Sequence, residues 1–156
     1  MMTTKTVRRR GRWRSERGVE LIETAITIPM LLLIAVGIFE FGRAYQSWQI
    51  LTNAAREGAR VSVLPSTTPG AAVDAARNYL QMGQLDNYAS ASIDVDQMSS
   101  IEVDGDDISA SLVTVQYPFD FIVLGPVARL ISPGTSLGGD LTMVASAVMR
   151  NEAAGP

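Results

Sequence analysis

Apolar residues dominate one continuous stretch near the N-terminus. In the rest of the chain they are interspersed with polar residues, first at helical spacing and then, from residue 91, in alternation. Residues 25–39 carry no charge, and residues 19–24 hold two carboxylates, Glu20 and Glu23. As a helix rising about 1.5 Å per residue, residues 19–39 would cover ~31 Å, which matches a hydrocarbon core of about 30 Å. The pattern predicts a transmembrane helix over residues 19–41. A carboxylate such as Glu23 in such a segment is costly and indicates a function.

The apolar pattern changes after residue 41 to a spacing of three and four residues. This spacing is typical of a helix with one apolar face, and it ends at Pro65. We therefore expect the helix to continue as an amphipathic segment over residues 42–64, and its small apolar residues suit close packing against a sheet. Tyr45 and Trp48 fit either an aromatic belt at the membrane interface or the core of the following domain. The apolar stripe consists of Ala44, Trp48, Leu51, Ala55 and Ala59.

A second helix is predicted from residue 69 to about residue 82. Thr68 is a suitable N-cap, Pro69 suits the first helical position, and Gly83 suits the C-cap. The helical spacing of its larger and smaller apolar residues gives one buried face. The residues expected on that face are Ala72, Ala76, Tyr79 and Leu80.

Residues 91–150 alternate with a period of two in four places, which predicts about four strands. Residues 91–97 and 100–104 precede a turn at Asp104-Gly105-Asp106, and residues 108–117 form the longest predicted strand. Residues 118–133 contain three prolines and are expected to form a packed loop with one helical turn. A last strand, within residues 138–150, is expected to bury Leu141, Met143 or Val144, and Val148, before a frayed tail. The fold class is α+β: a long N-terminal helix packed on a small antiparallel sheet, with one additional helix.

Charge is distributed very unevenly along the chain. Seven of the thirteen Lys and Arg residues precede Gly18, against one acidic residue, Glu16. From Tyr45 onward the chain carries five basic and twelve acidic residues. A basic segment directly before an apolar span follows the positive-inside rule better than it fits a nucleic-acid-binding arm. We therefore expect a cytoplasmic leader at residues 1–18, disordered over residues 1–16, and an extracytoplasmic domain at residues 65–156.

The composition excludes several kinds of catalytic site. The chain has no Cys and no His, so disulfides, thiol nucleophiles and His-based acid–base catalysis are excluded, as are zinc sites built on Cys or His. Its only lysine, Lys5, lies in the leader. The acidic residues near the turn lack the spacing of a calcium-binding loop, and a solvated hairpin is favoured. They are Asp94, Asp96, Glu102, Asp104, Asp106 and Asp107. We predict no catalytic site, no cofactor and no metal, and thus no enzyme.

Three short motifs resemble a known family. Residues 17–23 (RGVELIE) precede the apolar run, and GIFEFGR and LTNAAREGAR follow at residues 37–43 and 51–60. Type IV prepilins share a basic leader ending in Gly and a Glu at the fifth mature position. With these motifs and the segment ASAVMR in the last predicted strand (residues 145–150), the chain resembles the TadE-like minor pseudopilins of tight-adherence (Flp) pilus systems. Thr24 departs from the pattern, because the family often has an aromatic residue there.

The resemblance implies processing and assembly. A prepilin peptidase would cut between Gly18 and Val19, and Glu23 would set the register between subunits as their helices bundle. The implied partners are the prepilin peptidase, the major Flp pilin and other minor pilins, the membrane platform of the pilus machine, and membrane lipid, with no nucleic acid. The protein would be a single-pass protein of the cytoplasmic membrane. The resemblance also allows incorporation into the pilus at the cell surface.

Two other interpretations remain open. In the first, the chain is an uncleaved single-pass membrane protein whose extracytoplasmic domain binds a partner or ligand. In the second, a signal peptidase cuts after Ala44, because Gly42-Arg43-Ala44 has the small-x-small form of such a site. The second would place a cut within a continuous amphipathic helix.

Overall fold

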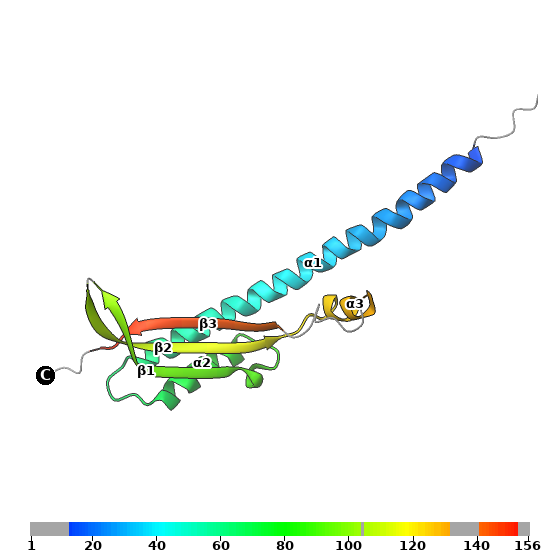
Figure 1. Cartoon of the computed structure of the whole chain (residues 1–156). Helices are drawn as coiled ribbons and strands as arrows, with labels where there is room; N and C mark the ends of the chain where they lie inside the picture. The colour runs from blue at the N-terminus through cyan, green and yellow to red at the C-terminus, as the bar shows by residue number, and fades with distance from the viewer. Residues whose placement is uncertain (1–12, 104, 132–140, 153–156) are drawn as a thin grey trace, which may run out of the picture. The chain divides into compact units, whose positions relative to one another are not determined.

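The computed structural model describes residues 13–103, 105–131 and 141–152. The elements are α1 (Trp13–Ser62), α2 (Pro69–Met82), a short 3-10 helix η1 (Tyr88–Ser90), β1 (Ser92–Val103), β2 (Asp106–Phe119), α3 (Leu124–Ile131) and β3 (Leu141–Arg150) (Figure 1). Contacts divide the chain into two compact units, residues 1–38 and residues 39–156. The chain is α+β, as the sequence predicts.

The first unit consists, in its described part, of the beginning of α1. Most of its apolar side chains from Val19 onward are exposed, and none of the most hydrophobic stretch is buried. A helix with exposed apolar side chains on every face fits a single-pass membrane protein. The helix begins at Trp13, so the expectation of disorder is wrong for residues 13–16. A helix stabilised by the apolar run extends backward at little cost, because each added residue forms another backbone hydrogen bond. Residues 1–12 lie outside the described part.

The sheet is antiparallel, in the order β1-β2-β3, and its described part has three strands rather than about four. The two strands expected at residues 91–97 and 100–104 are one strand, β1. Its pairing with β2 shifts between Asp96 and Ser99, which marks a bulge. The hairpin turn is confirmed: Val103 pairs with Asp106, and Gly105 adopts a φ of +89°, which a residue with a side chain rarely adopts.

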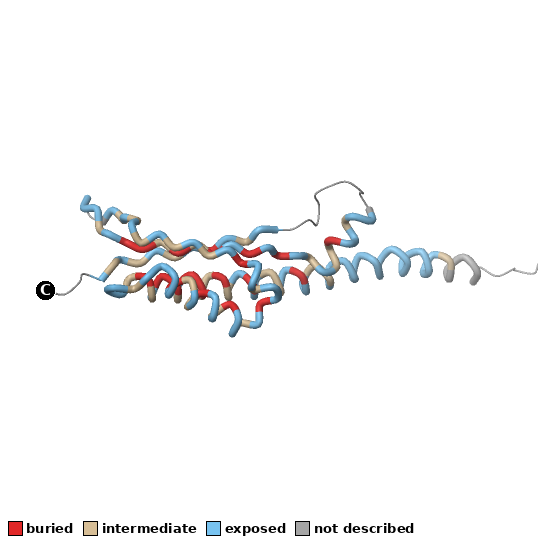
Figure 2. Tube along the Cα trace, turned by 90° about the horizontal axis from the view of Figure 1, so that it is seen from below, coloured by how far each residue is buried: buried red, intermediate tan, exposed pale blue. Residues whose placement is uncertain are grey.

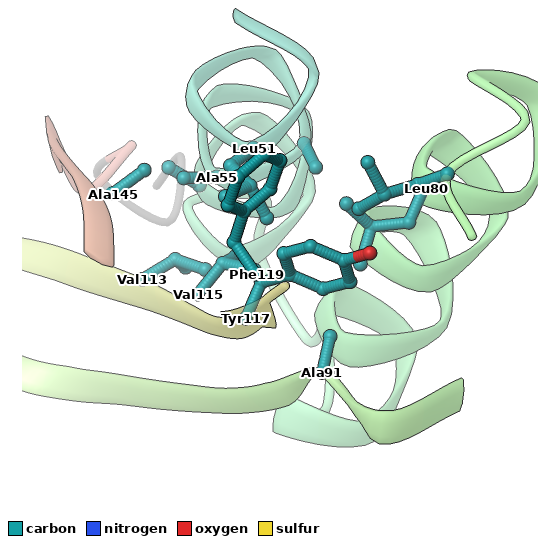
Figure 3. Packing of buried hydrophobic residues seen from close by; sticks show 12 residues of the cluster. Leu51, Ala55, Leu80, Ala91, Val113, Val115, Tyr117, Phe119 and Ala145 are labelled. Carbon is teal, nitrogen blue, oxygen red and sulfur yellow. The ribbon is translucent and has the colours of Figure 1, made fainter. Parts of the chain in front are cut away.

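The core lies between one face of this sheet and the helices. Figure 2 shows that the buried residues lie where the sheet and the helices face each other. Figure 3 shows Leu51 and Ala55 of α1 and Leu80 of α2 gathered above the apolar side chains of β2. Those β2 side chains are the buried Val113, Val115, Tyr117 and Phe119. The opposite face of the sheet is more polar and exposed, so residues 39–152 form a two-layer unit.

Close packing of α1 depends on small residues, as expected. A Cβ at Gly58 would lie 3.1 Å from Val113 Cγ1, 3.2 Å from Ala76 Cβ and 3.3 Å from the carbonyl oxygen of Ala72. Helices α1 and α2 and strand β2 therefore meet at Gly58 with no room to spare. Trp48 is wrongly placed on the buried stripe by the sequence, because it is 46% exposed. Tyr45 is exposed as well, so neither aromatic residue belongs to the core.

Helix α2 agrees with its prediction at both ends. It runs from Pro69 to Met82 with Thr68 as N-cap and Gly83 as C-cap. A Cβ at Gly83 would lie 2.7 Å from Ile50 Cγ2, which explains glycine there through a close approach to α1 rather than through backbone conformation. Three of the four residues expected on its inner face are buried, and Tyr79 is partly buried.

Strand β3 buries a different face from the one that the prediction for Val144 and Val148 requires. Ala145 is buried, and Met143, Ala147 and Met149 pack against the core. Val148 lies on the outer face and is 48% exposed, and Leu141 at the start of the strand is 46% exposed. The alternation itself favours the observed face, because positions 141, 143, 145, 147 and 149 are all apolar, whereas the other set holds Thr, Ser and Arg beside two valines.

The end of β3 is tied to the end of α1. Gln97 donates from Nε2 to the carbonyl oxygens of Ser62 and Thr67 at 3.1 and 3.2 Å. Asn151 donates from Nδ2 to the Gln97 carbonyl oxygen and accepts a hydrogen bond from Ser111 Oγ. Residues 151 and 152 are therefore held by hydrogen bonds, so the expected fraying after Arg150 is wrong for these two residues. Residues 153–156 lie outside the described part.

Candidate processing and assembly site

The residues predicted to be processed lie on the exposed surface of α1. Val19 is 62% exposed, and Gly18 lies one residue before it within the helix. A Cβ added to Gly18 would meet no atom within 4 Å. The described fold therefore gives no packing reason for a glycine at this position.

Glu23 lies on the same helix and is exposed. Within the described residues, its side chain makes no hydrogen bond and no ion pair, unlike Glu40 and Glu57 further along α1. Thr24 has a local partner: its Oγ1 donates to the Glu20 carbonyl oxygen at 2.8 Å. The structure therefore presents Val19 and Glu23 on the exposed surface of one helix, directly after the partly exposed Gly18.

A third carboxylate of the apolar helix has a different environment, which sequence reasoning missed. Glu40 is fully buried in the second unit. Its Oε1 accepts hydrogen bonds from the backbone N–H of Val123 at 2.5 Å and of Leu124 at 3.4 Å. These are the residues at the start of α3, whose first N–H groups have no partner within the helix. Glu40 therefore caps α3 from a distance of 83 residues along the chain.

Arg43 completes this arrangement, one turn after Glu40. Its Nη2 lies 3.3 Å from Glu40 Oε2 and also donates to the carbonyl oxygen of Asp120. Its guanidinium lies over the ring of Phe119, with Cζ 4.4 Å from the ring centroid, a cation–π contact. Its buried Nε has no hydrogen-bond partner among the described residues. We name Glu40, Arg43 and the backbone of residues 120–124 the Glu40 clamp.

Strand β2 and helix α3 occupy much of the segment 118–133, for which the sequence predicts a packed loop with one helical turn; residues 132–133 lie outside the described part. In the structure, β2 continues to Phe119, and α3 extends over eight residues, two turns rather than one. Pro126, the third residue of α3, is compatible with a helix start because the first N–H groups need no helical acceptor. The Glu-x-x-Arg spacing of Glu40 and Arg43, directly after the apolar run, is the sequence signal that indicates an ion pair at this position. Nothing local indicates which distant backbone it binds.

A second Glu–Arg pair with the same spacing lies near the end of α1 and is solvent-exposed. Glu57 Oε1 lies 2.6 Å from Arg60 Nη2, and 33% of the Glu57 side chain is exposed, against none of the Glu40 side chain. The hydrogen bond from Arg60, and then its charge, lower the pKa of the Glu57 carboxyl below its usual value. The two pairs have the same spacing and differ mainly in burial.

The described residues hold no group of three or more acidic side chains placed to bind a metal ion. The acidic residues near the hairpin turn are exposed along β1 and at the start of β2 in that part of the chain.

Comparison with known families gives a match that begins in the N-terminal part of α1. Residues 18–60 match the family model described as TadE-like protein. This part of the chain is therefore similar to TadE-like proteins. The match begins at Gly18, covers Glu20, Glu23, Glu40 and Glu57, and ends before α2, the sheet and α3. TadE-like proteins are components of the Tad pilus system, where they are structural rather than enzymatic, and they interact with its machinery. No curated protein and no solved structure matches the chain.

Proposed function

We propose that the protein is a minor pilin or pseudopilin of a tight-adherence pilus, cut by a prepilin peptidase and assembled through its N-terminal helix. The observation that carries the proposal is the overlap of a family match with an exposed apolar surface. The TadE-like match begins at Gly18, and most apolar side chains of α1 between Val19 and Phe39 are exposed. A surface of that size is unstable in water, so it calls for lipid or neighbouring helices.

Processing between Gly18 and Val19 requires the helix to open. The helix extends from Trp13 through the proposed cut, whereas a peptidase binds extended backbone. Glycine lowers the cost of opening, because it is less favourable in a helix than alanine by about 1 kcal/mol. It also brings no side chain into the enzyme. The cut would remove the whole leader with its seven basic residues, which until then hold the N-terminus in the cytoplasm.

Assembly would then pair the new amine with the existing Glu23 carboxylate in a dry environment. The cut creates an amine at Val19, and Glu23 lies four residues further along the same exposed surface. As apolar helices bundle, a carboxylate without a partner costs several kcal/mol, so pairing Glu23 with the Val19 amine of a neighbouring subunit would fix the register. The partners would be the prepilin peptidase, the major Flp pilin, other minor pilins and the membrane platform. The domain beyond residue 41 would be extracytoplasmic.

The structure bears unevenly on the two competing interpretations. A cut after Ala44 would separate Glu40 and Arg43 from the unit that they stabilise, leaving the start of α3 without its cap. The clamp therefore disfavours a secreted domain. An uncleaved single-pass protein would keep every described contact, and it is the alternative that the experiment has to exclude.

The test is the N-terminal residue of the protein recovered from cells that carry the pilus machinery. Val19 supports the proposal, Met1 or Met2 supports the uncleaved anchor, and Tyr45 supports secretion. Gly18→Ala should abolish the cut and leave the mass of the full chain. Gly37→Ala is the matched control, because a Cβ at either glycine meets nothing within 4 Å. An unchanged mature mass in Gly18→Ala would contradict processing at this bond.

A further inference from the structure

Helix α3 has an unusual distribution of polar and apolar residues. Gly125 is buried, and Leu124 and Ala128 are partly buried, so this side faces the rest of the unit. The outward side should be polar in a helix that borders water. Instead, Leu130 is 83% exposed and Val127 is 37% exposed, and Ile122 just before the helix is 56% exposed. Arg129 is the only charged residue of α3.

The position of α3 is fixed by the Glu40 clamp. Glu40 Oε1 accepts the N–H groups of Val123 and Leu124, so the start of α3 lies within one hydrogen bond of residue 40. Arg43 adds a second connection through the Asp120 carbonyl oxygen. Figure 1 shows α3 beyond the end of β2, away from the β1–β2 hairpin. The apolar side of α3 is therefore held at one end of the second unit.

That end of the unit is also where the apolar span ends. Phe39 and Phe41, on either side of Glu40, are 57% and 68% exposed. The polar zone between the hydrocarbon core and water is about 5–8 Å deep on each side of a bilayer. Eight helical residues measure ~12 Å at about 1.5 Å per residue. A helix that starts one hydrogen bond from residue 40 is thus close enough to this zone to enter it.

We propose that α3 lies in the membrane interface, with Ile122, Val127 and Leu130 inserted among the lipids and Arg129 at the headgroups. This rests on the part of the proposed function that places the apolar helix across a membrane. Lipid is favoured over a protein partner because exposed Phe39 and Phe41 continue the apolar surface of the span into the same unit. A positive charge next to apolar side chains is also the usual composition of interfacial helices. The domain would then have two membrane contacts, which would restrict its tilt.

The absence of Cys makes site-directed spin labelling direct, because one substitution gives one label. The full chain, reconstituted at low protein density in vesicles of phosphatidylcholine and phosphatidylglycerol, is labelled at Leu130→Cys. Leu33→Cys in the apolar run reports the span, and Met98→Cys, whose side chain is 93% exposed on β1, reports a site in water. Electron paramagnetic resonance measures label collisions with oxygen, which concentrates in lipid, and with a nickel chelate, which stays in water.

We expect the oxygen-to-nickel collision ratio at Leu130 to exceed that at Met98 several-fold and to approach that at Leu33. A ratio at Leu130 equal to that at Met98, with a lipid-like ratio at Leu33, would overturn the inference and leave the membrane span intact. A label at Leu130 shielded from both reagents would indicate a protein contact and would also overturn it. A water-like ratio at Leu33 would refute the membrane placement and, with it, both proposals.

Discussion

Replacing Glu40 with glutamine tests whether the clamp stabilises the second unit. Glu40→Gln keeps the shape of the side chain and removes its charge. The carboxylate accepts hydrogen bonds on both oxygens, from Val123 and Leu124 on one and from Arg43 on the other. An amide has one oxygen, and its NH₂ group would face a donor at the second position. One set of donors therefore loses its acceptor.

The expected loss of stability follows from the burial of the pair. Breaking a buried ion pair by removing one partner costs about 3–5 kcal/mol, because the remaining charge stays desolvated. The Arg43 side chain is 23% exposed, so water relieves part of that cost. We therefore expect the lower end, ~3 kcal/mol, a large fraction of the 5–15 kcal/mol that stabilises a typical domain.

The measurement is urea unfolding of the full chain in nonionic detergent micelles, followed by the near-ultraviolet circular dichroism of its aromatic residues. Glu57→Gln is the control, because it makes the same change in the same helix in a pair with the same spacing. Its effect should be much smaller, since solvent and salt screen an exposed pair. The slope of free energy against urea should stay constant if the clamp affects stability alone.

The comparison has a clear refuting outcome. The exposed pair is the closer one, at 2.6 Å against 3.3 Å. If contact distance rather than burial decided the contribution, Glu57→Gln would cost as much as Glu40→Gln or more. Equal losses, or a loss for Glu40→Gln below about 1 kcal/mol, the typical value of an exposed pair, would refute the clamp as a stabilising feature.

Two further predictions concern α1 alone. Glu23→Ala should leave the cut intact and reduce pilus assembly, whereas Glu20→Ala should affect assembly less; pili are counted by electron microscopy, and normal numbers with Glu23→Ala would contradict the register function. Gly58→Ala should destabilise the fold by about 1–3 kcal/mol in urea, because Val113 and α2 leave no space for a methyl group. Gly42→Ala, where a Cβ meets nothing within 4 Å, should be neutral or stabilising by up to ~1 kcal/mol, and a similar loss in both variants would exclude a packing cause.

The features that could be predicted from sequence are those that local patterns determine. The apolar span can be predicted from the length and composition of residues 19–41 alone. Helix α2 was placed with its caps at Thr68 and Gly83, because cap residues and Pro69 act within a few residues of the helix end. The β1–β2 hairpin was predicted because Gly105 allows the backbone conformation that the turn requires. In each case the deciding contacts lie within one helical turn or one hairpin.

The features that were missed depend on contacts between distant residues. The sequence gives two strands where β1 is one, because a bulge after Asp96 interrupts alternation without ending the strand. The prediction assigned Val148 to the core because of its large apolar side chain, although it alternates with Thr, Ser and Arg; the inward set of β3 includes the small residues Ala145 and Ala147, which pack against the core. The sequence predicts a loop in place of α3, because the cap of that helix comes from Glu40 rather than from a neighbouring residue.

Three glutamates of α1, Glu20, Glu23 and Glu40, look alike in the sequence, since each interrupts or borders an apolar run. The structure divides them by burial: Glu20 and Glu23 are exposed, and Glu40 is enclosed with Arg43 and two backbone N–H groups. A buried carboxylate that already has partners within its own chain is not available for a neighbouring subunit, because exchange would leave Arg43 desolvated. An exposed carboxylate in a membrane has the opposite requirement and is stable only after a partner arrives. Glu40 is thus part of the fold of one subunit, whereas Glu20 and Glu23 stay available to a partner, and Glu23 is the one that we propose pairs between subunits.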